Sequence, residues 1–283
     1  MAEESYEEAQ KAQQIKYELW GTPTEVEMAA AGPLQKLVAE GDSWFDYPPG
    51  LDILDQLKRN YGYKIDRHAR HGDTLENMTY GIEYSGNFQR ESPQLIRTLQ
   101  AIRDYKPRIV LFSGGGNDIA GKEFDSFFNH KDSGLQVLRE DFARYIFFTF
   151  YKKCYVHMME SVWRIDPTIH IISHGYGDAI PDGRSVINIM GIRFIGPWLR
   201  PAFTRKNVLN RLEAEAVIKK LIGLFNDLLK QLDDENANFH YLDLRPHIQR
   251  QDWVNELHLS SDAYKRVAAI FHAEIQSLLN QNP

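Results

Sequence analysis

The sequence contains one cysteine, Cys154, among 283 residues. A single thiol forms no disulfide within the chain and supplies no multi-cysteine metal site. Because Cys154 lies in an apolar helical segment beside Tyr155 and Met158, we expect a buried, inert thiol. The sequence also lacks an apolar stretch of about 18 residues, the length that a transmembrane helix requires.

Basic residues are not in excess, since 33 Lys and Arg face 39 Asp and Glu and the net charge is −6. Nucleic acids and anionic membranes bind basic surfaces, so we expect neither nucleic acid nor integral membrane contact. Residues 1–8 are acidic and lack the basic-then-apolar order of a secretory signal. We therefore expect a cytoplasmic protein with a small-molecule partner. The sequence indicates no oligomeric state.

Apolar residues make up 43% of the chain and charged residues 25%, as in a globular protein with a substantial core. The length suits one large α/β domain. We expect residues 1–30 to form a helical arm and residues 31–283 to form the domain. Two aromatic-containing segments, at about 119–136 and 174–205, match no regular element. Loops of this length are often functional, so we expect both insertions to shape a pocket.

Strands and helices alternate along the domain. Residues 108–112 form the clearest strand, a continuous apolar run after a proline and before glycines, as in buried parallel strands. We expect further strands at 37–39, 63–68, 169–172 and 239–244, and helices at 51–60, 92–102, 138–165, 208–232 and 261–279. This alternation predicts an α/β fold with a mostly parallel, five-stranded sheet covered by helices on both faces.

A serine and a histidine lie where predicted strands end. Ser43, in Gly41-Asp42-Ser43, follows the first strand, and His258 lies in the loop between the last strand and the last helix. Ligands of parallel sheets bind beyond the carboxyl ends of the strands. A serine hydroxyl becomes a good nucleophile when a neighbouring base takes its proton. The sequence therefore predicts Ser43 as nucleophile and His258 as base.

An oxyanion formed by attack of a serine needs preorganised hydrogen-bond donors. The backbone N–H of Ser43 and that of Gly72 are two candidates, and the side-chain amide of Asn117 is a third. Asn117 belongs to the glycine-rich segment 114–118 after the clearest strand. Alone, this segment is equally consistent with a plain turn or a phosphate-binding loop.

Together, these segments resemble the conserved blocks of the SGNH hydrolases, also called the GDSL-type esterase/lipase family. Residues 41–43 are similar to the nucleophile block, Gly72 to the glycine of the second block, residues 115–118 to the G-x-N-D block, and His258 to the histidine of the last. The resemblance spans about residues 36–275. It implies a flavodoxin-like, three-layer α/β/α sandwich and an ester hydrolase that uses no metal or organic cofactor. It also implies an oxyanion hole formed by Ser43, Gly72 and Asn117.

The last block departs from the family pattern, in which an aspartate three residues before the histidine orients the imidazole. That position is Asn255 here. An amide accepts a hydrogen bond from an imidazole but does not balance an imidazolium charge; in another serine hydrolase the Asp-to-Asn change costs about 10⁴ in turnover. Three alternatives stay open: Asn255 orients His258, a nearby carboxylate (Asp252 or Glu256) does so, or Ser43 and His258 act as a dyad.

Aromatic residues near the predicted site suggest a substrate pocket. Trp44 follows the nucleophile, and Tyr176 and Trp198 lie in the second insertion; Trp44 is equally consistent with core packing. We expect a small acyl or carbohydrate ester as substrate. The alternatives are a lysophospholipase or thioesterase of the same family, or a non-catalytic flavodoxin-like binding domain. His68 and His71 lack an accompanying carboxylate cluster, so no metal site is expected.

Overall fold

The computed structural model describes residues 36–47, 50–84, 90–120, 122–185 and 196–281, and the predicted arm lies outside these ranges. Five strands form a sheet in the order β2-β1-β5-β6-β7. They are Lys36–Gly41 (β1), Lys64–Arg67 (β2), Ile109–Ser113 (β5), His170–His174 (β6) and Phe239–Leu242 (β7). All neighbouring strands in it run parallel. This order is that of flavodoxin-like folds, so the predicted fold class is confirmed.

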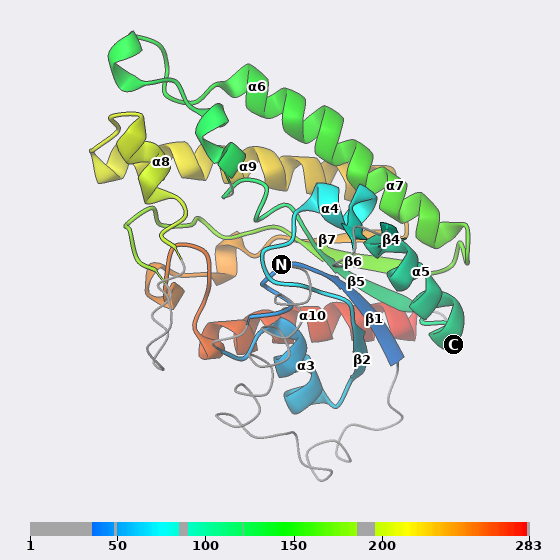
Figure 1. Cartoon of the computed structure of the whole chain (residues 1–283). Helices are drawn as coiled ribbons and strands as arrows, with labels where there is room; N and C mark the ends of the chain where they lie inside the picture. Colours follow the sequence, from blue (N-terminus) through cyan, green and yellow to red (C-terminus); the bar gives the residue numbers. More distant parts are fainter. Residues whose placement is uncertain (1–35, 48–49, 85–89, 121, 186–195, 282–283) are drawn as a thin grey trace.

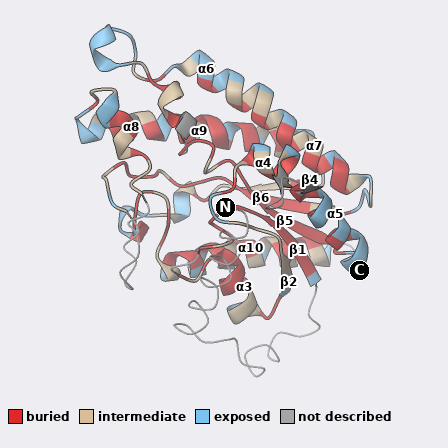
Figure 2. Cartoon of the chain, in the orientation of Figure 1, coloured by how far each residue is buried: buried red, intermediate tan, exposed pale blue. Residues whose placement is uncertain are grey.

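The centre of the sheet is apolar on both faces because helices cover both. All five residues of β5 are buried, as are the last five of β1. Helices α3 (Ile53–Tyr61) and α10 (Ser261–Asn280) pack together on one face, and α5 (Gln94–Tyr105), α7 (Lys152–Trp163) and α9 (Arg211–Glu235) lie on the other (Figure 1). The three central strands β1, β5 and β6 are buried almost throughout, whereas the residues of β2 and most of those of β7 are partly exposed (Figure 2).

The helix expected over 138–165 is present but contains a π-helical turn. It consists of α6 (Glu140–Tyr145), the π-helical turn η3 (Ile146–Tyr151) and α7. Phe147 and Tyr151 are buried within η3, and the Phe147 ring packs 6.0 Å from Phe225 of α9. The sequence pattern did not predict this turn, because aromatic residues lie on every side of the segment.

Several short elements were not predicted. They are α4 (Leu75–Tyr80), the antiparallel pair β3 (Ile82–Tyr84) and β4 (Arg90–Pro93), and α8 (Arg200–Arg205). The predicted start of α5 at Ser92 was two residues early, because β4 pairs with β3 there. The first insertion contains the 3₁₀ turns η1 (Lys122–Phe127) and η2 (Lys131–Ser133), and two further turns, η4 (Arg245–His247) and η5 (Arg250–Asp252), follow β7.

None of the helices in the described ranges combines the length and apolarity needed to cross a bilayer. The residues predicted to form the site lie at the carboxyl edge of the sheet. At that edge β1 lies between β2 and β5, the point where the strand order reverses and where ligands of such sheets bind.

Candidate active site

Ser43 lies in a tight turn that follows β1. The backbone N–H of Asp42 donates to the Ser113 carbonyl (3.0 Å), and that of Trp44 donates to Oδ1 of Asp42 (3.0 Å). At Gly41 the chain passes so close to β5 that a Cβ atom would lie 2.8 Å from the Ser113 Cβ, which explains the glycine. The turn holds Ser43 at the carboxyl edge of the sheet, where its residue surface is 8% exposed.

His258 lies in a closed loop between η5 and α10. Trp253 and Leu259 form an antiparallel bridge across this loop, and the N–H of Val254 donates to the His258 carbonyl (3.0 Å). The Nε2 atom of His258 lies 2.8 Å from Oγ of Ser43. The fold thus brings together two side chains that are 215 residues apart in the sequence, within hydrogen-bonding distance.

Asn255 is the residue that contacts the other nitrogen of the imidazole. Its Oδ1 lies 3.0 Å from Nδ1 of His258 and accepts the backbone N–H groups of Leu257 and His258, each at 2.9 Å. Because two N–H donors identify Oδ1 as the acceptor, Nδ1 of His258 carries the proton and Nε2 is free to accept from Ser43. The Asn255 amide nitrogen donates to the Tyr47 hydroxyl (3.2 Å).

The surroundings of His258 keep its imidazole neutral. Burial, together with a smaller effect of the nearby His71, lowers the pKa of His258 to about 3. The ring of Tyr47 stacks on the imidazole with 4.3 Å between centroids, and the Trp198 ring meets it edge-on at 5.7 Å. No carboxylate balances a charge on this ring among the contacts described. His258 is therefore a proton acceptor at neutral pH.

The two carboxylates considered as orienting groups are bound elsewhere. Asp252 forms an ion pair with Arg266 (2.6 Å) and accepts the backbone N–H of Gln249 (2.8 Å). Glu256 is buried and accepts backbone N–H groups of residues 183 and 198–200. Of the three residues left open by the sequence, the structure therefore places Asn255 against the imidazole.

Two of the expected oxyanion donors lie on neighbouring loops. Nδ2 of Asn117, in the turn after β5, donates to the carbonyl of Asp73 (2.8 Å), which directly follows Gly72. Gly72 has a φ of +78° and is exposed, with nothing within 4 Å of a hypothetical Cβ. Asn117 lines the same cavity as Ser43, and its contact with Asp73 connects it to the Gly72 loop.

The histidines considered for a metal each bind a carboxylate singly. Nε2 of His68 lies 3.1 Å from Asp66, and Nδ1 of His71 lies 2.9 Å from Oδ2 of Asp46, which also accepts the His71 backbone N–H (3.1 Å). Asp46 follows Ser43 closely in sequence, so this pair ties the Gly72 loop to the nucleophile turn. In the described part of the chain, no three His, Cys, Asp or Glu side chains are grouped as metal ligands.

A buried polar chain beneath Ser43 was not predicted from the sequence. Asp42 accepts the hydroxyl of Tyr176 and lies 2.8 Å from Oγ of Ser113, which in turn lies 2.9 Å from Nε2 of His174. Nδ1 of His174 faces the Gly175 carbonyl, which only accepts, so Nε2 of a neutral imidazole is an acceptor. Burial raises the pKa of Asp42 to about 6, and a proton on Asp42 would satisfy both contacts of Ser113. The pairing of β5 with β1 and with β6 brings these residues together.

An apolar cavity opens beside Ser43. Its volume is about 480 Å³ including the open mouth. Polar groups of Asp42, Ser43 and Asn117 line the end near the nucleophile. The rest of the wall consists of Gly116 and of apolar and aromatic side chains: Trp44, Ile119, Ala120, Tyr176, Ala179, Leu199, Ile218, Leu221, Ile222, Trp253 and Leu257.

The three aromatic residues predicted to bind substrate differ in position. Trp44 and Tyr176 line the cavity and are buried, so Trp44 serves both as core and as cavity wall; its indole N–H donates to the Leu257 carbonyl (3.0 Å). Trp198 packs against His258 at the edge of the site. Ile218, Leu221 and Ile222 of α9 also line the cavity. The sequence predicted the helix over 208–232 but did not indicate that these residues border a cavity.

Comparisons with known proteins agree with this architecture. Residues 41–271 match the model of the family described as GDSL-like Lipase/Acylhydrolase. Among solved structures, the lipase Lip_vut3 from a goat rumen metagenome is similar, with a TM-score of 0.52 and 15% identity over 84% of this chain and 96% of that one. A family 3 carbohydrate esterase of Clostridium thermocellum has a TM-score of 0.49 and 14% identity over 89% of this chain and all of that one.

No curated protein matches the chain by sequence. At 15% identity the similarity to the goat rumen lipase concerns the fold alone, and the family model establishes the relationship. It spans β1 to α10 and includes the Ser43 turn, the loops of Gly72 and Asn117, and the His258 loop. The chain belongs to the GDSL-like lipase/acylhydrolase family, the SGNH hydrolases, whose members are ester-acting hydrolases.

Proposed function

We propose that this chain is a serine ester hydrolase in which Ser43 is the nucleophile and His258 the general base. The observation that carries the proposal is the 2.8 Å contact between Oγ of Ser43 and Nε2 of His258. As Oγ bonds to the acyl carbon of the ester, its proton passes to Nε2. The imidazolium then returns this proton to the departing alcohol, leaving an acyl group on Ser43.

Deacylation repeats the same steps with water. Nε2 of His258 takes a proton from a water molecule, the resulting hydroxide attacks the acyl-Ser43 carbonyl, and the proton returns to Oγ as the acid leaves. The oxyanion of each tetrahedral intermediate accepts hydrogen bonds from the N–H groups of Ser43 and Gly72 and from the Asn117 amide. Loss of one such donor costs about 10²–10³ in rate.

Asn255 orients His258 without balancing its charge. It fixes the Nδ1–H tautomer through the 3.0 Å contact, and the carbonyl dipole stabilises the transient imidazolium less than a carboxylate would. We infer a slower enzyme than a triad with aspartate, but one whose base stays unprotonated well into the acidic range.

The cavity lining favours an aliphatic acyl group as the part of the substrate that enters beside Ser43. The wall beyond the nucleophile has no charged side chain, and the oxygens of Asp42 at its mouth already accept from Tyr176 and Trp44. A sugar in this space would leave hydroxyl groups without partners, at a cost of roughly 1–3 kcal/mol each. We therefore propose a short- to medium-chain acyl ester, with the alcohol portion outside the cavity; a carbohydrate is then a leaving group rather than the buried group.

A series of p-nitrophenyl esters from acetate to decanoate tests this function. Each added methylene that enters the cavity is expected to raise kcat/KM about fourfold, from about 0.8 kcal/mol per buried methylene, until the cavity is full. Ser43→Ala and His258→Ala, purified alongside, should reduce every rate to background. Equal rates in wild type and Ser43→Ala would refute the serine mechanism and favour a non-catalytic binding domain.

The lysophospholipase or thioesterase alternative makes a different prediction in the same series. The apolar cavity wall supports this alternative if the cavity holds a long acyl chain. A maximum at decanoate, with hydrolysis of lysophosphatidylcholine or of an acyl-coenzyme A, would favour that alternative over a small-ester hydrolase.

A further inference from the structure

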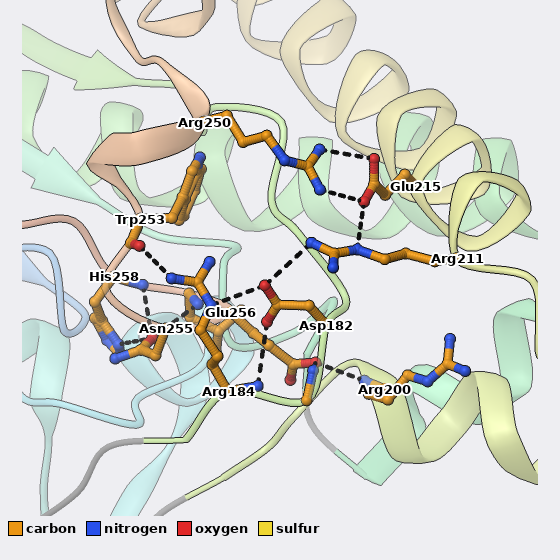
Figure 3. A network of polar contacts seen from close by, with 12 residues as sticks. Asp182, Arg184, Arg200, Arg211, Glu215, Arg250, Trp253, Asn255, Glu256 and His258 are labelled. Carbon is orange, nitrogen blue, oxygen red and sulfur yellow. Dashed lines mark hydrogen bonds and ion pairs between the residues drawn. The ribbon is translucent and has the colours of Figure 1, made fainter.

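The Glu256 carboxylate is fully buried and accepts four backbone N–H groups from two other segments. They belong to Gly183 (2.9 Å), Trp198 (2.6 Å), Leu199 (2.7 Å) and Arg200 (3.0 Å). The exposed fraction of Glu256 is 0%. Figure 3 shows it between the His258 loop and the start of α8, at the centre of a larger polar network. No side-chain cation pairs with it among the contacts described.

The four donors match what an ionised carboxylate accepts. Two carboxylate oxygens offer about four lone-pair positions, and each N–H fills one. The O–H of a protonated carboxyl group would face these N–H donors and find no acceptor among them. Leu199 occupies the N-cap of α8 and its own side chain makes no capping bond. Glu256 supplies that cap from a distant part of the chain, where its negative charge also faces the positive end of the helix.

The segment that Glu256 holds borders both parts of the site. Leu199 lines the apolar cavity beside Ser43, and Trp198 meets the imidazole of His258 edge-on. Glu256 itself lies two residues before His258, and its neighbour Leu257 also lines the cavity. One carboxylate therefore connects the loop of the base to the cavity wall.

We propose that Glu256 is a positioning residue that fixes the Leu199 wall of the acyl cavity relative to the Ser43–His258 pair, and so determines the preference for longer acyl chains. Among the residues that the structure describes, its hydrogen bonds go to backbone N–H groups of residues 183 and 198–200 and not to Ser43 or His258. The part of this inference that concerns acyl chains depends on the proposed ester hydrolysis.

The part of the network around Arg250, Arg211 and Glu215 lies toward solvent and provides a control. Arg250 and Arg211 both pair with Glu215, with 2.8 and 2.9 Å between the charged groups. The side chains of these arginines are 57% and 49% exposed, and exposed ion pairs contribute little. Glu215→Gln thus removes a carboxylate from the same network without touching residues 198–200.

The test compares Glu256→Gln with Glu215→Gln on p-nitrophenyl acetate and p-nitrophenyl hexanoate. In Glu256→Gln the amide N–H groups face the backbone N–H donors of residues 198–200 and do not bind them. The Leu199 wall is therefore ordered for a smaller fraction of the time. Loss of one bond to a charged group corresponds to a factor of about ten or more, and the apparent affinity falls with the ordered fraction. We expect KM for the hexanoate to rise about tenfold, with kcat for the acetate within about threefold of wild type. Glu215→Gln should change neither.

Equal losses on both esters, or no loss, would overturn the proposed role. Leu199→Ala keeps the backbone hydrogen bonds and removes only the wall, so it should reproduce the hexanoate-specific loss even if Glu256→Gln fails to fold.

Hydrogen exchange separates this inference from the proposed function. The amides of residues 198–200 should exchange slowly in wild type and in Glu215→Gln, and faster in Glu256→Gln. If the wild type hydrolyses no ester while this exchange difference is seen, the esterase proposal fails and the anchoring role of Glu256 stands. Unchanged exchange in Glu256→Gln refutes the anchoring.

Discussion

Replacing Asn255 by aspartate is the most informative perturbation of the candidate site. Asn255 Oδ1 lies 3.0 Å from Nδ1 of His258, and an aspartate oxygen in that position would accept the same three N–H groups. The second oxygen would face the Tyr47 hydroxyl, which then donates instead of accepting. The substitution therefore changes the charge beside the imidazole while leaving the hydrogen-bond positions intact.

The size of the expected pKa shift of His258 follows from the distance between the imidazole and the new carboxylate. At an effective dielectric constant of about 20, two unit charges at about 4 Å interact by about 4 kcal/mol, which corresponds to roughly 3 pKa units. Burial of the new carboxylate opposes this, so the value is an upper limit. The pKa of His258 is about 3 in the native protein, and we expect a rise toward about 6 in Asn255→Asp.

The sign of the pH effect is fixed by the role of the base. Only neutral His258 accepts the Ser43 proton, so kcat/KM falls as the pH drops through its pKa. The wild-type acidic limb should lie near pH 3–4, if the fold persists there, and that of Asn255→Asp should lie one or more units higher. Above pH 7 the variant should be at least tenfold faster, because the carboxylate stabilises the imidazolium; the reverse change in another serine hydrolase costs about 10⁴.

The assay is the pH dependence of kcat/KM on one p-nitrophenyl ester, with Asn255→Ala as the control that removes the acceptor. A collapse of activity in Asn255→Asp, with the fold intact, would refute this reasoning. It would show that the amide N–H to Tyr47 is itself required for the site.

Three further substitutions test other parts of the account. Asn117→Ala should lower kcat by about 10²–10³ with little change in KM, measured by steady-state kinetics, because it removes one oxyanion donor. Asp252→Ala should lower the melting temperature, since it breaks the 2.6 Å pair with Arg266, while leaving kcat within about threefold. Burial raises the pKa of Glu40 to about 8, so the folded protein favours the protonated side chain. The stability that this carboxyl group provides is complete below its pKa in the unfolded chain and is lost as the pH rises through about 8. Denaturant titrations should show the free energy of unfolding falling from pH 5 to 8 in wild type, and falling less in Glu40→Gln.

The sheet was predictable because its strands are marked by composition. The continuous apolar run of β5, flanked by Pro107 and glycines, indicates a buried parallel strand without reference to any other part of the chain. Because the strands were predicted to be mostly parallel, their carboxyl ends were expected at one edge of the sheet, and with them Ser43 and His258. Residues 215 positions apart were thus related through topology alone.

The orientation of His258 was not predictable, because it depends on how one loop closes. Asn255, Asp252 and Glu256 all lie within six residues of His258. The bridge between Trp253 and Leu259 turns Asn255 toward the imidazole, Asp252 toward Arg266 and Glu256 toward α8. Spacing alone therefore left three alternatives.

The residues of the cavity wall were not predictable from the sequence for a different reason. Ile218 and Ile222 of α9 fit the apolar stripe of any core-facing helix, and Leu199 belongs to a segment without a regular pattern. The α9 stripe faces the cavity because the first and second insertions spread over the carboxyl edge of the sheet. The cavity is lined by six separate segments of the chain, and none of them carries a periodic pattern that marks its part in the wall.

Reaction with a fluorophosphonate, followed by peptide mapping, tests the central claim most directly. The account predicts one covalent adduct on Oγ of Ser43 in the folded protein, abolished in Ser43→Ala and strongly slowed in His258→Ala. A folded wild-type sample that stays unlabelled, or that carries the label on another residue, would contradict it.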